Sequence, residues 1–401
     1  MAMTFRFHFS AISIFVGSVM LCTTGLGAEV SSTSKDQFSG FPEIGKHRPG
    51  IRSQEVINSD VVKGVIRPKW TRAMGDLGGW TRMFRMKKNI ILFYPHCDGH
   101  RGKKYEATGK VIRLLSKDEG KTWQRLPASD NVPEEVIVVG DTAYGYSFPG
   151  HIQTTVQTSQ DGIHWSEPKK VYKSPFWLYG VIYDKTSKQF WAAAHAIDKV
   201  VKYTRQIHLV KSADGFDWQH VSTVHYNQRE SESILRFEDD RTMVILIRKK
   251  YADGRMCWMA VGNPPYKKWD ITERPVMMEG EHFFDIGGQT FVGSRALYQG
   301  DDPRITANDS SFLKGRFSII YKWTPDRQFK PWAVMDSMGD CSYPHLVETP
   351  TEILCAYYSQ HEDKVCKPYL CAYDKAEFLA GPAMCPLPHL KPSNGKSTNC
   401  D

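Results

Sequence analysis

The chain has 401 residues, of which 41% are hydrophobic, 24% charged and 12% aromatic. This is an ordinary globular composition, and it excludes a disordered, collagenous or coiled-coil chain. The formal net charge of +8 is small for this length, and the basic residues are scattered rather than clustered. We therefore expect no nucleic-acid partner, whereas a small anionic substrate is compatible with the charge.

Residues 1–28 have the pattern of a cleavable signal peptide. Arg6 provides the positive start, an apolar run follows over 11–21, and small residues precede Glu29. The run is too short to cross a bilayer, and no later segment reaches the roughly 18 apolar residues that a span requires. The sequence thus predicts a secreted or periplasmic protein without a membrane span. Lipidation at Cys22 is the lesser alternative, because Leu21 stands where a small residue is expected.

The rest of the chain reads as β-structure. Residues 29–60 are polar and turn-rich, which indicates an extended lead-in, and 381–401 form a C-terminal tail. Between them, over 61–380, short β-branched and aromatic runs are bounded by Gly, Pro, Asp or Asn. These predicted strands are 89–94, 136–139, 190–194, 242–247, 317–321 and 353–358. Long segments of helical periodicity are missing, which argues against a doubly wound α/β fold.

Eight cysteines follow the signal peptide, and six of them lie after residue 340. An even number in an exported chain permits disulfides, so we expect one to three in the C-terminal region. No pair has the Cys-x-x-Cys spacing of a zinc ribbon, and we predict neither a metal site nor another cofactor. These cysteines are Cys97, Cys257, Cys341, Cys355, Cys366, Cys371, Cys385 and Cys400.

A short motif repeats along the chain. Segments 116–123, 159–165 and 212–218 each carry Ser, Asp, Gly and Trp in the same order, and 263–269 and 324–332 are degenerate copies. Asp can cap backbone N–H groups, Gly takes a positive φ, and Trp packs back under the turn of a β-hairpin. The tryptophans lie 42, 53, 51 and 63 residues apart. Such a period predicts four-stranded blades of a β-propeller.

The repeated turns resemble the Asp-boxes of the sialidase (BNR-repeat) superfamily. That resemblance implies an all-β, six-bladed propeller, with the turns on the outside and away from the active site. Six blades of about 55 residues account for the chain after the lead-in. Within the superfamily the sequence is more similar to a less characterised bacterial branch than to a typical sialidase.

Four residues match the order of the sialidase catalytic groups. Glu232, Arg248, Arg295 and Tyr343 are separated by 16, 47 and 48 residues. The resemblance implies that Tyr343 is the nucleophile and Glu232 its base, and that the two arginines hold a substrate carboxylate. A phenol suits this role, because an anionic nucleophile would be repelled by a sugar that already carries a carboxylate.

The remaining site residues depart from the sialidase pattern. Arg82 is displaced by two or three positions from the expected first-blade arginine, and the expected acid/base aspartate has no clean match. Asp98 or His100 could supply the proton, since imidazole titrates near neutrality. Asp340, at a predicted turn, and His361, at the end of a predicted strand, are further candidates for substrate contact or acid/base work.

We therefore predict an exported, monomeric, sialidase-type exo-glycosidase that acts on an acidic sugar of a glycan. Two alternatives stay open. One is a polysaccharide lyase for uronate-containing glycans, with His100 or Tyr343 as base and the arginines neutralising the uronate. The other is a non-catalytic sugar-binding propeller, which the imperfect first arginine and the unmatched aspartate favour.

Overall fold

The computed structural model describes residues 64–97, 111–129, 131–196, 205–227, 230–249, 257–297, 316–362 and 365–382. The predicted signal peptide (1–28), the lead-in (29–60) and all but two residues of the predicted tail lie outside these ranges. Among the described helices, none has the length and hydrophobicity that crossing a membrane requires.

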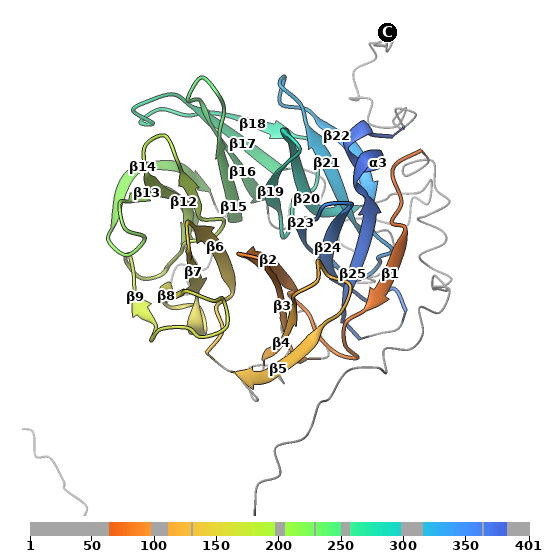
Figure 1. Ribbon diagram of the computed structural model, residues 1–401. Coiled ribbons are helices and arrows are strands. Elements are labelled where there is room, and N and C mark those ends of the chain that lie inside the picture. Colours follow the sequence, from red (N-terminus) through yellow and green to blue (C-terminus); the bar gives the residue numbers. More distant parts are fainter. Residues whose placement is uncertain are drawn as a thin grey trace, which may run out of the picture. The chain divides into compact units, whose positions relative to one another are not determined.

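Six antiparallel sheets are arranged around a central axis, and each forms one blade of a β-propeller (Figure 1). The predicted six-bladed propeller is therefore confirmed. Blade 1 contains β2 (Arg82–Met86), β3 (Asn89–Pro95), β4 (Val111–Ser116) and β5 (Gln124–Ser129). Blade 2 contains β6 (Glu135–Val139), β7 (Thr142–Ser147), β8 (Thr155–Ser159) and β9 (Lys169–Lys170), with a 3-10 turn at Pro149–His151. Blade 3 contains β10 (Phe176–Trp177), β11 (Ile182–Asp184), β12 (Gln189–Ala196), β13 (Arg205–Ser212) and β14 (Trp218–Asn227).

The other three blades follow the same plan. Blade 4 contains β15 (Glu230–Phe237), β16 (Met243–Lys249), β17 (Cys257–Gly262) and β18 (Asp270–Arg274). Blade 5 contains β19 (His282–Ile286), β20 (Gln289–Leu297), β21 (Arg316–Trp323) and β22 (Phe329–Val334). Blade 6 contains β23 (Ser342–Glu348), β24 (Glu352–Ser359), β25 (Lys367–Asp374) and, from the other end of the chain, β1 (Trp70–Ala73).

Strand β1 closes the ring of blades. It pairs antiparallel with β25, with Trp70 opposite Ala372, so an early segment of the chain supplies the outer strand of the last blade. The pairing covers the edge of β25 and joins the two ends of the ring, and it leaves the four-residue β1 as a short outer edge. The short helix α3 (Lys375–Ala380) follows β25 and buries Phe378 against the ring of Phe291.

The three repeated turns share one geometry. In each, the serine Oγ accepts a hydrogen bond from the glycine N–H, at 2.8 Å in the first and second turns and 2.9 Å in the third. The three glycines, Gly120, Gly162 and Gly215, have φ of 83°, 76° and 82°. Trp123 Nε1 donates to the Gly120 carbonyl at 3.0 Å, so the tryptophan packs beneath the turn. The hairpin-turn chemistry that the motif predicts is therefore present.

Replacing Gly120 by alanine is expected to destabilise the propeller by more than the cost of a left-handed backbone at an alanine. A Cβ at Gly120 would overlap Leu354 Cδ1 in the core of blade 6, which adds about 1–3 kcal/mol of overpacking to about 1–2 kcal/mol for the left-handed backbone. Gly288→Ala is the matched control, because its φ is 74° and a Cβ there meets nothing within 4 Å. Urea unfolding measures both, and equal losses would contradict the predicted contact with Leu354.

The expected disulfides are absent from the described part of the C-terminal region. Cys341, Cys355, Cys366 and Cys371 are buried free thiols there, so that expectation is wrong for these four residues. Cys355 and Cys371 face each other across β24 and β25, where they pack as small apolar side chains of the blade core. Burial raises the pKa of the Cys341 thiol to about 11, so it stays protonated at neutral pH. Cys385 and Cys400 lie outside the described residues.

Candidate active site

Two strand irregularities at the start of inner strands bring a tyrosine and a glutamate together. Tyr343 lies in β23 at a φ of 54°, and the pairing of β23 with β24 shifts register between Ser342 and His345. Glu232 lies in β15, inside a similar shift between Glu230 and Ser233. Bulges of this kind re-aim a side chain, and positive φ at a bulky residue is a strained state often found at functional sites. The Tyr343 hydroxyl donates to Glu232 Oε1 at 2.7 Å.

The surroundings of this pair set the protonation of both groups. Burial, and then the Glu232 charge, raises the pKa of Tyr343 well above its usual value. Burial alone would raise the pKa of Glu232, but the charge of Arg248 and its hydrogen bond outweigh burial and lower it. At neutral pH the pair is therefore a phenol donating to a carboxylate, the starting state for a base-assisted nucleophile.

A second carboxylate, Glu279, joins the two predicted arginines. Arg248 Nη2 donates to Glu279 Oε1 at 3.0 Å, and Arg295 Nη1 donates to Glu279 Oε2 at 2.6 Å. Arg248 also forms an ion pair with Glu232, and Arg295 Nη2 lies 2.8 Å from Asp340 Oδ1. Two guanidinium groups thus face three carboxylates. We call Tyr343, Glu232, Arg248, Glu279, Arg295 and Asp340 the tyrosine cluster.

The structure therefore brings together five of the residues predicted from sequence. Tyr343, Glu232, Arg248, Arg295 and Asp340 come from blades 4, 5 and 6 and the segment before β23, and ion pairs and hydrogen bonds link them. From the sequence we expected the two arginines to hold a substrate carboxylate. Instead, Glu279 already accepts one hydrogen bond from Arg248 and one from Arg295.

Arg82 lies close to Tyr343 without joining this network. Its Cζ is 4.4 Å from the centre of the Tyr343 ring, and its Nη2 donates to Glu135 Oε1 at 2.6 Å. Its Nε donates to the Glu134 carbonyl at 2.8 Å, so the guanidinium is held by blade 2 and lies against the face of the phenol.

Three further residues were predicted from the sequence. His361 is buried in blade 6, where its ring centre lies 4.5 Å from that of Tyr369 at a tilt of 43° and its Nδ1 lies 3.0 Å from Ser359 Oγ. Asp98 and His100 lie outside the described residues. Their assignment as proton donors stays a prediction from the sequence.

Two glutamates that we did not predict from the sequence lie beside the Tyr343–Glu232 pair. Glu279 and Glu281 flank Gly280, which has a φ of 62° immediately before β19. The signal was available, because this Glu-x-Glu run precedes its strand much as Glu230-Ser-Glu232 begins β15. Glu281 is fully buried, and neither of its carboxyl oxygens has a hydrogen-bond partner among the described residues.

Glu281→Gln is expected to change how stability depends on pH. Burial, and then the Glu232 charge, raises the pKa of Glu281 well above 4.5, so the folded state keeps a proton that the unfolded chain releases. Folding stability therefore falls as pH rises above about 4.5, by up to about 1.4 kcal/mol per pH unit from this group. The variant lacks this contribution, so its stability relative to wild type should grow between pH 4.5 and 7.

Urea unfolding at several pH values measures that difference. Glu167→Gln, at an exposed position, controls for the loss of one carboxylate from the chain. A difference between Glu281→Gln and wild type that stays constant with pH would show that Glu281 is not protonated in the folded protein.

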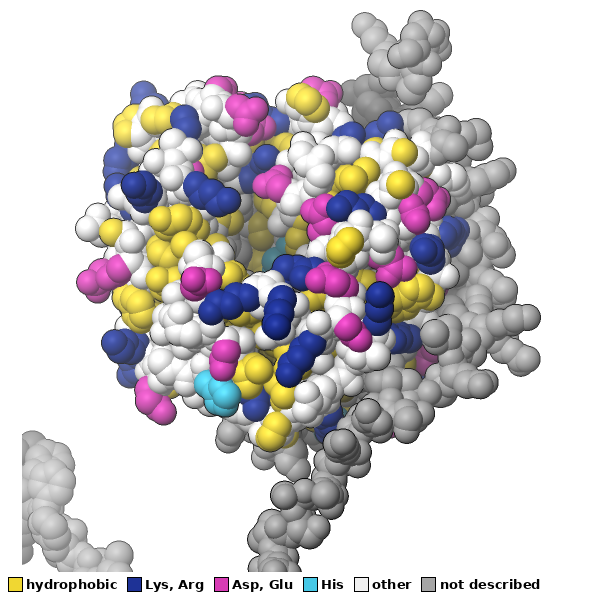
Figure 2. Space-filling view, in the orientation of Figure 1, with side chains coloured by type: hydrophobic (Ala, Val, Ile, Leu, Met, Phe, Trp, Pro, Cys, Tyr) yellow, Lys and Arg dark blue, Asp and Glu magenta, His cyan; other side chains and the backbone are white. Residues whose placement is uncertain are grey.

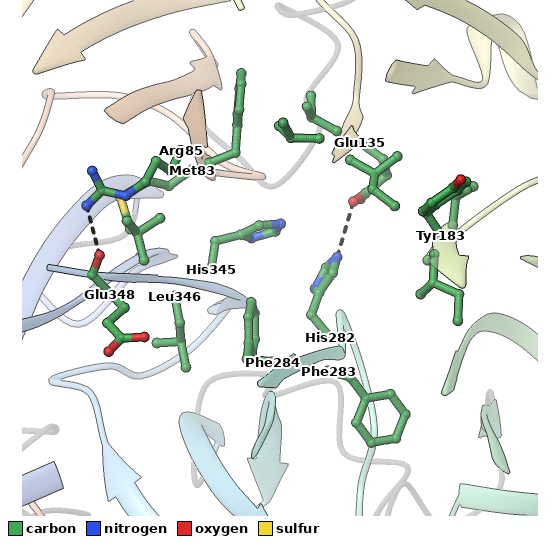
Figure 3. A pocket seen from close by; sticks show the side chains of 18 of the residues that line it. Met83, Arg85, Glu135, Tyr183, His282, Phe283, Phe284, His345, Leu346 and Glu348 are labelled. Atoms are coloured by element: carbon green, nitrogen blue, oxygen red, sulfur yellow. Dashed lines mark hydrogen bonds and ion pairs between the residues drawn. The ribbon is translucent and has the colours of Figure 1, made fainter. Parts of the chain in front are cut away.

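A cavity of about 950 Å³ opens along the propeller axis. Its lining comes mainly from later residues of the inner strands, among them Met83, Leu235, Phe284 and Leu346, whereas Arg82, Glu232 and Tyr343 lie just outside the lining. Figure 2 shows the hollow at the centre of the ring, with Lys, Arg, Asp and Glu side chains around it. Figure 3 shows Glu135, His282 and His345 pointing toward one another within it.

Comparison with known proteins identifies the fold. No family model matches the chain, and no curated protein matches its sequence. Among solved structures, a protein of unknown function from Dyadobacter fermentans is similar at 14% identity and a TM-score of 0.60, over 78% of this chain and all of that one. The endosialidase of phage phi92 is similar at 9% identity and a TM-score of 0.52, over 82% of this chain and 71% of that one.

A Trypanosoma rangeli sialidase, solved as a covalent intermediate with 2,3-difluorosialic acid, is similar at 13% identity and a TM-score of 0.52. The similarity covers 77% of this chain and 55% of that sialidase. The chain has a sialidase-like propeller fold. At these identities the likeness concerns the fold alone, so the chemistry must be argued from the residues of the sialidase-like propeller itself.

Proposed function

We propose that this protein is a glycoside hydrolase in which Tyr343 is the nucleophile and Glu232 its base. The observation that carries the proposal is the 2.7 Å hydrogen bond from the Tyr343 hydroxyl to Glu232. Two backbone irregularities hold these side chains against each other, and Tyr343 is only 2% exposed. A buried tyrosine packed only as core would need neither an ionised carboxylate partner nor a strained backbone.

The proposed reaction has two steps. In the first, the phenol oxygen bonds to the anomeric carbon while Glu232 accepts the phenol proton and the glycosidic C–O bond breaks. The leaving oxygen takes a proton from an acid, for which Asp98 and His100 are the candidates from sequence. In the second, the deprotonated acid accepts a proton from water, the water oxygen bonds to the anomeric carbon and the bond to tyrosine breaks, while Tyr343 regains its proton from Glu232. The sugar leaves with retained configuration.

The proposed substrate is a glycan that ends in an acidic sugar, such as sialic acid or a uronic acid. Glu279 supports this choice, because one carboxylate already bridges Arg248 and Arg295 with one oxygen on each. The two guanidinium groups are thus spaced to hold a carboxylate. We propose that the substrate carboxylate takes the place of Glu279 when it binds. We also propose that the protein is secreted or periplasmic and acts as a monomer.

A substrate panel tests this function. Purified protein is incubated with fluorogenic sialosides, fluorogenic uronides and neutral glycosides, and with uronate-containing oligosaccharides. Release of an acidic sugar is expected, with little release of neutral sugars. A product that absorbs in the ultraviolet because it contains a new C=C bond would show that the protein is a lyase and not a hydrolase. Glycan binding without bond cleavage on the whole panel would show that the protein is a non-catalytic, sugar-binding propeller.

A further inference from the structure

Three metal-ligating side chains from three different blades meet on the propeller axis. Glu135 begins β6, His282 begins β19 and His345 lies in β23. Each offers one ligand atom, and the three atoms lie within 4.8 Å of one another. We call these three residues the histidine cluster. All three line the axial cavity, as Figure 3 shows.

Neighbouring groups orient each of these side chains. Arg82 Nη2 holds Glu135 Oε1 at 2.6 Å, and Glu135 Oε2 lies 3.2 Å from His282 Nε2. His345 Nδ1 lies 3.1 Å from the Tyr343 carbonyl, which accepts the Nδ1 proton and leaves the lone pair on Nε2. Metal-binding histidines characteristically donate their other ring N–H in this way.

An independent observation points to a missing ligand at the same place. His282 Nδ1 is buried and has no hydrogen-bond partner among the described residues. The rings of His282 and His345 lie 4.3 Å apart at 52°, although two imidazoles gain little from each other in the absence of a shared partner. Buried polar atoms are normally satisfied, so a ring whose Nε2 faces Glu135 and whose Nδ1 has no partner among the described residues calls for a further polar partner.

We propose that Glu135, His282 and His345 bind one divalent transition-metal ion, with Zn²⁺ as the best fit. Two imidazoles and one carboxylate suit zinc and its neighbours, whereas Ca²⁺ and Mg²⁺ require mainly oxygen ligands. Tetrahedral zinc with bonds of about 2.1 Å holds its ligand atoms about 3.4 Å apart. The ligand atoms of the cluster lie within 4.8 Å of one another, so each pair would have to approach by at most about 1.4 Å.

The ion would tie blades 2, 5 and 6 together close to Tyr343, whose ring centre lies 6.4 Å from that of His282. His345 is two residues from Tyr343 and bonded to its carbonyl, and Arg82 contacts both Glu135 and the Tyr343 ring. The fourth coordination position faces the cavity, where a water or a ligand oxygen can complete it. This inference does not depend on glycoside hydrolysis, because it concerns a different set of side chains.

Metal titration of the full chain tests the site. Protein stripped with a chelator is titrated with ZnCl₂ by calorimetry, and Co²⁺ is added separately to record its visible absorption. One Zn²⁺ per chain, a tetrahedral Co²⁺ spectrum and a rise in melting temperature with Zn²⁺ are expected. A wild-type protein that binds no Zn²⁺ at this stoichiometry would overturn the proposal.

Variants decide which residues hold the ion. His345→Gln and His282→Gln are each expected to weaken Zn²⁺ binding at least tenfold and to abolish the rise in melting temperature. His164→Gln is the control, because His164 also pairs with a carboxylate, that of Asp161 at 2.6 Å, but lies on the surface. Unchanged Zn²⁺ affinity in both cluster variants, or its loss in the control, would contradict the assignment. If a variant fails to fold by circular dichroism, the wild-type Co²⁺ spectrum and stoichiometry decide.

Discussion

Tyr343→Phe is expected to reduce kcat by at least about 10³-fold on the best substrate of the panel. The substitution removes only the oxygen that forms the covalent bond and leaves the ring against Trp80 and Tyr358. Glu232→Gln should reduce kcat by about 10²–10⁴-fold, because the amide cannot accept the phenol proton. Steady-state kinetics measures both losses, and melting temperatures check that each variant is folded.

Tyr146→Phe is the control for removal of a buried phenol oxygen. The Tyr146 hydroxyl donates to the Gly215 carbonyl at 3.2 Å, between blades 2 and 3 and outside the tyrosine cluster. Its kcat should match that of the wild type. A Tyr343→Phe protein that keeps more than a tenth of the wild-type kcat would remove Tyr343 from the nucleophile role.

Arg295→Met is expected to destabilise the folded protein by about 3–5 kcal/mol at neutral pH. Arg295 is 5% exposed and carries ion pairs to Glu279 and Asp340, so its loss removes one cation from each of these carboxylates in a largely buried site and leaves Glu279 with Arg248 alone. The Asp340 side chain is more exposed than that of Glu279, so hydration of Asp340 offsets part of this cost. Urea unfolding gives the free energy.

Arg85→Met provides the matched comparison. Arg85 also forms an ion pair, with Glu119 at 2.6 Å, but both side chains are about one-third exposed, so its loss should cost under about 1 kcal/mol of ion-pair energy. If the two variants lose equal stability, the network around Arg295 contributes no more than a surface pair.

The propeller could be predicted because its signal is local and repeated. Ser, Asp, Gly and Trp in each turn make contacts within eight residues, and those contacts recur in three blades. The strand runs between them have the composition of buried β-strands, and their spacing fixes how many four-stranded blades the chain can form. Pairing of β1 with β25 carries no such signal, since it joins residues about 300 positions apart.

The tyrosine cluster could be predicted only in part. Tyr343, Glu232, Arg248 and Arg295 stand in an order and spacing that resemble those of sialidases, whereas Glu279 has no counterpart in that pattern. The histidine cluster could not be predicted from the sequence, because residues 135, 282 and 345 come together only when the ring of blades closes. The disulfide expectation failed for a related reason. The number of cysteines does not show whether they form disulfides or remain as free thiols packed in the core of a blade.

The account depends most on whether Tyr343 forms a bond to the sugar, and mass spectrometry can detect that bond. The protein is incubated with a fluorinated, slowly hydrolysed analogue of the sugar that it releases fastest, and then digested. The proposed mechanism predicts one sugar adduct on the peptide that contains Tyr343, and its absence in Tyr343→Phe. Turnover of the natural substrate without an adduct, or an adduct on another residue, would contradict it.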